Sequence, residues 1–360
     1  MPRILYVAYP LLQVFDQSAG GAEQVLWTLE REMTRRGTHT TVAASAGSRV
    51  SGNLFSTGEP CTQPDDYERR RIEHEDRVVD FVRRREREGL PFDLIHDMSG
   101  SFWQRAGEFD TPVLATLHLP RSFYPAGSFY GVPENVKFNC VSDSQARSFA
   151  DLAALAGVVP NGIALDCFAG DDAAELNHSR EGLLWLGRIC EEKAPHLALE
   201  IAGKAGLPIT IAGQVYPFSY HQQYFGREVV PLLRIVPNAE FVSAPPAELK
   251  RRLLRQARAL LITSQAEETS SLVAMEAAAS GTPVIAFRRG ALPDVVREGV
   301  TGFLVEGVEH AVAALQQLSS ISPANCVQQA RENFSAKKMA EKYSELYERL
   351  YRPEKVLRFA

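Results

Sequence analysis

The chain has 360 residues, of which 45% are hydrophobic and 23% are charged. This balance is typical of a soluble globular protein and excludes a disordered, collagenous or coiled-coil chain, and the length predicts two domains. The net charge of -5 excludes a general polyanion binder such as a nucleic-acid protein. The net charge does not exclude a local basic site for a phosphate group.

The five cysteines lie far apart, with no CxxC motif and an odd count. We interpret them as reduced intracellular thiols that form neither a disulfide framework nor a zinc site. Residues 4–15 are apolar enough to resemble a signal peptide, but Pro10 and Gln13 interrupt the run and a helix start follows. No other apolar run approaches the ~18 residues of a membrane span. We expect a cytoplasmic protein, and peripheral membrane association is left open.

Strands alternate with helices in the first half of the chain. Apolar runs predict strands at residues 3–9, 39–44, 92–97, 112–118 and 136–142. A helix is expected over 22–36, ending at Gly37, and a polar loop from 45 to about 64. The helix expected over 65–89 has eight arginines against nine acidic residues, which indicates a solvated face rather than a nucleic-acid stripe. Another helix is expected after Ser142.

Residues 154–163 are interpreted as a linker, with domains at 1–163, together with a returning helix in about 336–360, and at 164–335. Strands of the second domain are expected at 182–187, 208–213, 239–243, 259–264, 283–287 and 302–305. Strands that alternate with helices predict parallel sheets with right-handed crossovers. The fold class is therefore α/β, with two Rossmann-like domains facing across a cleft and ligands at the carboxyl ends of the strands.

The segment ALLITSQAEETSSLVAMEAAASGTPVIAF (259–287) predicts a buried strand, a loop, a helix capped by Ser270 or Ser271, and another buried strand. Glu276 lies in this helix among apolar residues, with no cation one turn away. Because an unpaired buried carboxylate is costly, it needs a polar partner. That partner is either a side chain of another element or the hydroxyls of a ligand. Glu268, on the loop before the helix, lies at the same strand end.

In LLWLGRICEEKAPHLALEIA (183–202), Arg188 and Lys193 follow the first strand of the second domain. A diphosphate requires fixed cations at such a place. Arg188 supplies a planar guanidinium group, and Lys193 supplies a compact ammonium charge. The alternative is that they are ordinary surface cations.

In the first domain, Gly20 and Gly21 precede a helix start, where backbone amides can approach an anion closely. His118 ends a buried strand and is a candidate site residue. The alternative interpretation is a surface histidine whose hydrogen bonds are already made. Asp97 and Ser99 lie at another strand end and are candidates for an acceptor pocket. The absence of G-x-G-x-x-G argues against a dinucleotide oxidoreductase.

These motifs resemble family 4 of the nucleotide-sugar glycosyltransferases, which are retaining enzymes with the GT-B fold. The resemblance implies that Glu268 contacts the transferred sugar, that Glu276 binds the ribose of the nucleotide, and that Arg188 and Lys193 bind the diphosphate. It implies a catalytic contact of His118 with the donor sugar. The remaining donor-binding candidates are Gly20, Gly21, Gly213, Ser270, Ser271 and Leu272. The amides of Ser271 and Leu272 lie at a helix start, which is suited to a phosphate.

One departure from the family pattern is that Thr269–Ser271 replaces the usual Pro-Phe-Gly or Gly-Phe-Gly. The predicted function is transfer of a sugar from a nucleoside diphosphate sugar to an unidentified hydroxyl acceptor. The alternatives are a catalytically weak sugar-nucleotide-binding scaffold, prompted by this departure, and a nucleotide-sugar epimerase or hydrolase. The sequence has no Asp-x-Asp pair, so we expect no metal and no other cofactor.

Overall fold

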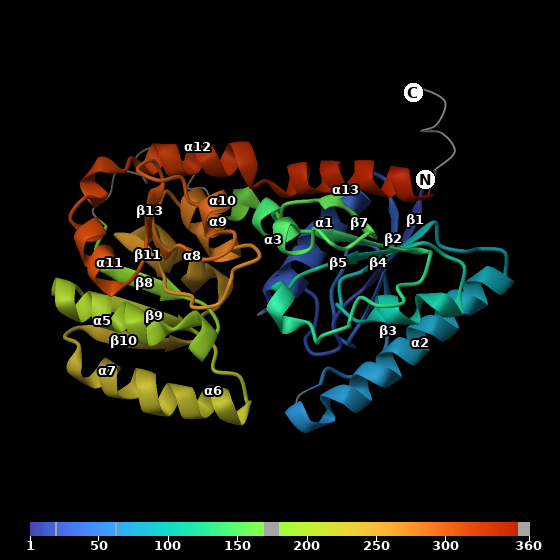
Figure 1. Cartoon of the computed structure of the whole chain (residues 1–360), viewed down its shortest axis with the longest axis horizontal. Helices are drawn as coiled ribbons and strands as arrows, with labels where there is room; N and C mark the ends of the chain where they lie inside the picture. The colour runs from blue at the N-terminus through green and yellow to red at the C-terminus, as the bar shows by residue number, and fades with distance from the viewer. Residues whose placement is uncertain (19, 62, 169–179, 352–360) are drawn as a thin grey trace. The chain divides into compact units, whose positions relative to one another are not determined.

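The computed structural model describes residues 1–18, 20–61, 63–168 and 180–351 (Figure 1). The chain divides into two compact units, one of Met1–Gly162 with Ala336–Ala360 and one of Ile163–Ser335. This division lies one residue before the boundary expected from the sequence.

The described residues of the first unit form a seven-stranded parallel sheet with the strand order β3-β2-β1-β4-β5-β6-β7. Its strands are β1 (Arg3–Val7), β2 (His39–Ala44), β3 (Asn53–Ser56), β4 (Leu94–Asp97), β5 (Val113–Thr116), β6 (Val136–Cys140) and β7 (Leu155–Val158). The central strands β4 and β5 are buried along their whole length, as continuous apolar runs require. The order reverses between β1 and β4, where Rossmann-like sheets bind their ligands.

The two edge strands, β3 and β7, correct the sequence prediction, which placed a loop and a linker there. Three of the four residues of β3 are exposed, and every residue of β7 is only partly buried. An edge strand has one neighbour and less covering, so it needs no apolar run. The pattern that identified the other strands was therefore missing in these two.

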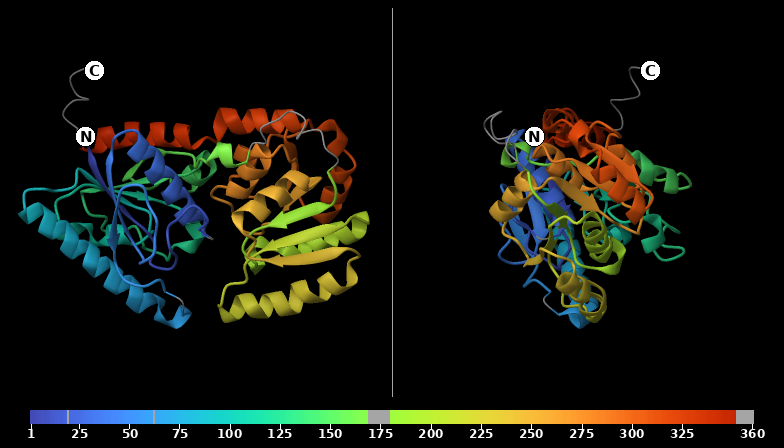
Figure 2. Two further views of the ribbon diagram at one scale, coloured as in Figure 1. Left: turned by 180° about the vertical axis from the view of Figure 1, so that it is seen from behind. Right: turned by 90° about the vertical axis from the view of Figure 1, so that its left-hand side faces the viewer.

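The helices of the first unit are α1 (Gly21–Arg35), α2 (Tyr67–Arg87), α3 (Asp143–Ser148) and α13 (Ala336–Tyr351), with 3₁₀ turns at Pro64–Asp66, Phe102–Glu108 and Arg121–Phe123. Gly37, with a φ of +86°, follows the end of α1. Arg69 of α2 pairs with Glu73 at 2.8 Å, with both side chains exposed, one of the ion pairs of the solvated face that the charge pattern predicted. Figure 2 shows α13 beside α1, although the two helices are at opposite ends of the chain.

A buried hydrogen-bond network fixes α13 on the first unit. Tyr343 and Tyr347 of α13 are 0% and 1% exposed. The Nδ1 atom of His96 lies 2.6 Å from the Tyr347 hydroxyl, and its Nε2 atom lies 2.7 Å from the Thr116 hydroxyl. The Tyr343 hydroxyl lies 3.1 Å from that of Thr116 and accepts a bond from Asn139 at 3.2 Å. Satisfied buried networks of this kind specify one packing arrangement, so the returning helix belongs to the first unit.

The described residues of the second unit form a six-stranded parallel sheet with the order β10-β9-β8-β11-β12-β13. Its strands are β8 (Leu183–Leu186), β9 (Ile209–Gly213), β10 (Ala239–Ser243), β11 (Ala259–Ile262), β12 (Val284–Phe287) and β13 (Gly302–Val305). Each of the strands expected for this domain is present. The two parallel sheets confirm the predicted α/β class with two Rossmann-like domains.

The helices of the second unit are α5 (Pro195–Ala205), α6 (Ser219–Tyr224), α7 (Val230–Ile235), α8 (Ala247–Gln256), α9 (Leu272–Ala279), α10 (Leu292–Val295), α11 (Val308–Leu315) and α12 (Pro323–Asn333). Single 3₁₀ turns lie at Leu165–Cys167, Glu191–Lys193 and Leu318–Ser320, and a π-helical turn, Phe225–Val229, joins α6 to α7. Across the described ranges of both units, no helix is long and apolar enough to cross a membrane.

The buried His74 predicts a pH dependence of stability. It is 1% exposed, and burial lowers its pKa to about 4 from an ordinary 6.5. Between pH 6.5 and 4 the unfolded chain binds a proton at this histidine, whereas the native state does not. The free energy of unfolding therefore falls as the pH falls, by at most ~3 kcal/mol. We expect His74→Gln to show a shallower decline than the wild type in urea unfolding across this range. Equal declines would contradict a neutral buried histidine.

Candidate functional site

The loops that follow β8 and β11 meet, because these two strands are neighbours in the sheet. Lys193, after β8, places its Nζ atom 2.5 Å from Oε1 of Glu268, after β11. The Ser264 hydroxyl donates a hydrogen bond to the same carboxylate oxygen. The Glu268 side chain is 9% exposed and that of Lys193 is 35% exposed. The structure therefore brings together two of the predicted catalytic residues.

The backbone of Lys193 is fixed to the end of β11. Thr263, which is 1% exposed, donates its hydroxyl to the carbonyl oxygens of Lys193 at 3.1 Å and Ala194 at 2.8 Å. Ala194 has a φ of +48°, a left-handed conformation that costs a residue with a side chain roughly 1–2 kcal/mol. The tight turn orients the ammonium group of Lys193 toward Glu268.

A third loop, after β12, fixes the backbone of Glu268. The amide of Ala291 donates to the carbonyl oxygen of Glu268 at 2.7 Å. Gly290 has a φ of +52°, and a Cβ atom on it would lie 2.2 Å from that oxygen. Only glycine fits this close approach. Gly290 was not among the site residues predicted from the sequence.

Glu276 lies on α9 and is 3% exposed. Its Oε1 atom pairs with Nζ of Lys250, on α8, at 2.7 Å. The structural partner that the sequence left open is therefore present for one oxygen. The other oxygen, Oε2, is buried and has no hydrogen-bond partner within the described residues. An unsatisfied buried acceptor is costly, and a ligand hydroxyl would satisfy it.

The amino terminus of α9 carries the predicted phosphate-binding amides. Ser271 occupies the N-cap position before Leu272, but its side chain makes no capping hydrogen bond, so the expected serine cap is absent. The Ser270 hydroxyl is buried without a partner among the described residues. The first-turn amides of a helix lack intrahelical partners, so this terminus is suited to an anion. Gly281, with a φ of +69°, follows the end of the helix.

Arg188 and Gly213 lie at the ends of β8 and β9. Arg188 is exposed, and no residue in the described ranges forms an ion pair with it. A Cβ atom on Gly213 would lie 1.8 Å from the carbonyl oxygen of Gly187. Gly213 is therefore required for the close packing of the two strand ends, and its contact with a donor stays a prediction.

In the first unit, Gly20 is the N-cap of α1 and Gly21 is its first residue. A Cβ atom on Gly20 would lie 1.9 Å from Oε2 of Glu23. Glu23 is 5% exposed, and burial raises its pKa to about 7. The carboxyl group of Glu23 thus fills space at the helix start, where the sequence predicted a ligand.

His118 lies two residues beyond β5 and is partly buried. Burial lowers its pKa to about 4, so the imidazole is neutral at neutral pH. A neutral imidazole with this pKa is a weak base, but it can donate or accept a hydrogen bond. This electrostatic state suits a residue that binds a sugar hydroxyl better than one that removes a proton.

Asp97 is fully buried, and its carboxylate accepts three hydrogen bonds. The amide and hydroxyl of Ser99 each donate to Oδ1 at 2.7 Å, and the amide of Trp103 donates to Oδ2 at 2.9 Å. Burial raises the pKa of Asp97 to about 6, although these donors act in the opposite direction. The structure thus shows both candidate acceptor residues fixing their own loop, and their contact with an acceptor stays a prediction.

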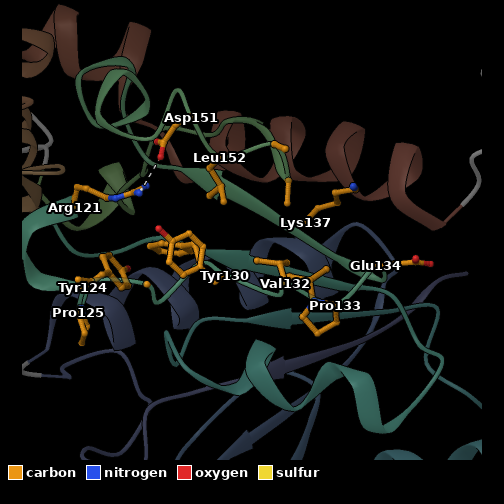
Figure 3. Close-up of a pocket in the computed structure, with 16 residues that line it drawn as sticks. Arg121, Tyr124, Pro125, Tyr130, Val132, Pro133, Glu134, Lys137, Asp151 and Leu152 are labelled. Atoms are coloured by element: carbon orange, nitrogen blue, oxygen red, sulfur yellow. Dashed lines mark hydrogen bonds and ion pairs between the residues drawn. The ribbon is translucent and has the colours of Figure 1, made fainter.

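A pocket of about 530 Å³ lies in the first unit (Figure 3). Its lining includes Tyr124 and Tyr130, from the aromatic loop after β5, and an ion pair between Arg121 and Asp151 at 3.1 Å. Tyr130 is 88% exposed, so it is free to stack on a ligand. However, the lining also includes Lys137, near the amino end of β6. The pocket therefore extends away from the carboxyl strand ends where ligands of such sheets bind.

Comparison with known proteins shows what this chain is similar to. Residues 171–336 match the family model described as glycosyl transferases group 1. A D-inositol 3-phosphate glycosyltransferase of Mycolicibacterium paratuberculosis is 33% identical over 259 residues, which make up 63% of this chain and 58% of that protein. The chain thus spans less than two thirds of the length of this relative.

Solved structures show the same fold over almost the whole chain. AviGT4, a glycosyltransferase involved in avilamycin A biosynthesis, matches with a TM-score of 0.74 and 22% identity over 98% of this chain and 99% of that one. HepE of Anabaena, in complex with UDP-glucose, matches with a TM-score of 0.74 and 16% identity over 96% and 99%. The chain therefore has the fold of these glycosyltransferases, and residues 171–336 are similar to the glycosyl transferases group 1 family.

Proposed function

We propose that this protein transfers a sugar from a nucleoside diphosphate sugar to a hydroxyl acceptor, with retention of anomeric configuration and without a metal ion. The observation that carries the proposal is the pairing of Lys193 with Glu268 at the carboxyl ends of β8 and β11. In the proposal, the ammonium group of Lys193 serves the leaving phosphate, and the carboxylate of Glu268 serves the sugar hydroxyls. The UDP-glucose bound by HepE supports a nucleoside diphosphate sugar as the donor.

In this proposal, the second unit holds the donor. Arg188, Lys193 and the amino terminus of α9 bind the diphosphate, and Oε2 of Glu276 accepts a hydrogen bond from the ribose. When the diphosphate attracts Lys193, Glu268 turns its freed oxygen to a hydroxyl of the sugar. In the first unit, the neutral imidazole of His118 donates a hydrogen bond to a sugar hydroxyl.

During the reaction, the bond from the anomeric carbon to the diphosphate oxygen breaks, and the electron pair stays on that oxygen. The acceptor oxygen bonds to the anomeric carbon on the face that the diphosphate leaves, and the acceptor proton passes to the departing oxygen. Arg188 and Lys193 stabilise the developing negative charge. His118 is too weak a base to take this proton, and the carboxylate of Asp97 is already occupied by hydrogen bonds. The acceptor proton therefore passes to the departing diphosphate.

The proposal is tested by measuring release of nucleoside diphosphate with and without candidate acceptors. Acceptor-dependent release supports a transferase, and release in water alone supports a hydrolase. Tight donor binding without turnover supports the scaffold suggested by Thr269–Ser271. A thermal-shift screen of nucleoside diphosphates first identifies the base, because a ligand at 100 times its dissociation constant adds ~2.7 kcal/mol of stability.

We expect the product to keep the anomeric configuration of the donor. Inversion requires a positioned base to deprotonate the acceptor, and neither His118 nor Asp97 is suited to that role. Proton NMR of the first-formed product, from a donor of known anomer, measures the outcome. A product of opposite configuration would exclude the same-face reaction.

We also expect full activity in excess chelator. Arg188, Lys193 and the α9 terminus supply the positive charge that a metal ion otherwise provides for the diphosphate. The initial rate with EDTA should equal that of untreated protein. Activity that is lost with EDTA and restored by magnesium or manganese would contradict the proposed metal-independent mechanism.

A further inference from the structure

Three side chains with metal-binding atoms meet beside the turn that carries Lys193. Cys190 and Glu192 belong to that turn, and His221 comes from α6. The Cys190 sulfur, a Glu192 carboxylate oxygen and a His221 ring nitrogen all lie within 4.8 Å of one another. Cys190 is 0% exposed and His221 is 1% exposed. Two of the three side chains are therefore enclosed, and Glu192 is partly exposed.

The cluster contains polar atoms that nothing in the described part of the chain satisfies. Both ring nitrogens of His221 and the Oε2 atom of Glu192 are buried without a hydrogen-bond partner. Native proteins seldom leave such atoms unpaired, and an exception calls for a bound water, an ion or a functional role. A single cation among the three side chains would satisfy one atom of each.

The local structure holds the three side chains in place. The rings of Tyr216, Phe218 and Tyr220 surround His221, with centroid distances of 6.0, 5.4 and 4.2 Å. The amide of Lys193 donates to the carbonyl oxygen of Cys190 at 3.2 Å. The amide of Gln265, after β11, donates to the carbonyl oxygen of Glu192 at 2.8 Å. The aromatic rings limit the access of water, and the backbone bonds fix the turn.

We propose that Cys190, Glu192 and His221 bind one zinc-like divalent cation. Thiolate, imidazole and carboxylate are the ligand types that Zn²⁺ takes in proteins, with a fourth position left for water. A sulfur ligand disfavours Mg²⁺ and Ca²⁺, which prefer oxygen. On binding, the Cys190 thiol releases its proton to solvent, and the cation links the 188–193 turn to α6.

This proposal departs from the sequence expectation of no zinc site. That expectation rested on the spacing of cysteines along the chain, whereas His221 reaches the cluster through the fold. The proposed cation site lies outside the reaction steps described above, so activity in chelator is still expected. Its test uses neither donor nor acceptor, and its outcome is therefore independent of the proposed glycosyl transfer.

The test is titration of the metal-free, full-length protein with Co²⁺ and then Zn²⁺. We expect a thiolate-to-cobalt charge-transfer band that saturates at one equivalent and disappears when Zn²⁺ is added. Cys190→Ser should abolish the band. In competition titrations, His221→Gln should weaken Zn²⁺ binding at least ~10-fold, because even residues that only support a ligand contribute on that scale.

Two matched variants separate this site from adventitious binding. Cys167→Ser removes an exposed cysteine of the same unit, and His196→Gln removes a histidine whose Nδ1 lies 2.6 Å from the Tyr224 hydroxyl. Both should bind cobalt and zinc as the wild type does. The proposal is overturned if the wild type shows no band, or if the band survives Cys190→Ser or is lost in Cys167→Ser. Should Cys190→Ser not fold, Glu192→Gln, at a partly exposed position, replaces it, and unchanged zinc affinity in that variant overturns the proposal.

Discussion

Replacing Lys193 with alanine is expected to lower turnover at least ~100-fold, the scale of losing one preorganised electrostatic stabiliser. Its ammonium group stabilises charge that develops on the leaving diphosphate, so the effect should fall on the chemical step more than on donor binding. The fold should survive, because the Lys193 side chain is 35% exposed and Glu268 keeps its bond from Ser264. Single-turnover kinetics at saturating donor measure the loss.

Lys204→Ala is the matched control. Lys204 lies on α5, and its ion pair with Glu309 is on the surface, with side chains 51% and 72% exposed. This variant should turn over like the wild type. Near wild-type turnover of Lys193→Ala would remove Lys193 from the mechanism. Because Lys193 and Glu268 are in contact, the effects of Lys193→Ala and Glu268→Gln should be non-additive in the double variant.

Replacing Glu276 with glutamine is expected to weaken nucleoside diphosphate binding by ~1.5–3 kcal/mol, the range for a hydrogen bond to a charged group. The amide keeps the size of the side chain and one acceptor oxygen, which can face Lys250. It loses the buried carboxylate oxygen that is proposed to accept a bond from the ribose. Calorimetric titration with the nucleoside diphosphate measures the change in affinity.

Two variants on α8 make this result specific. Glu248→Ala removes an exposed glutamate and should leave the nucleotide affinity unchanged. Lys250→Met removes the partner of Glu276 and should lower the free energy of unfolding, because it leaves a buried carboxylate without its cation. Unchanged nucleotide affinity in Glu276→Gln would mean that the carboxylate serves only its pair with Lys250.

The sequence predicts this fold best where strands are buried on both faces. β8 and β11 were placed by their apolar runs, because a strand with two neighbours and two covered faces must be apolar throughout. β3 and β7 were not predicted, because edge strands have no such apolar run. The local apolar pattern therefore predicts the central strands of each sheet but not the strands at its edges.

Contacts at the candidate site were harder to predict than its residues. Lys193 and Glu268 were identified by resemblance, but their ion pair depends on β8 and β11 being neighbours, which the order of strands along the chain does not reveal. The partner of Glu276 was missed for the same reason, since Lys250 comes from a different helix. The cluster around Cys190 also required the fold, because His221 belongs to a distant segment.

The position of α13 has a consequence for how the chain folds during synthesis. The strands of the first unit end with β7 at Val158, but the helix whose tyrosines bond to His96 and Thr116 is made only after the whole second unit. At ~5–20 residues per second, this interval lasts on the order of 10 s. During that time the nascent sheet carries an uncovered apolar face with unsatisfied polar groups. The first half to leave the ribosome is thus the last to be completed, and that face is where a chaperone would be expected to bind.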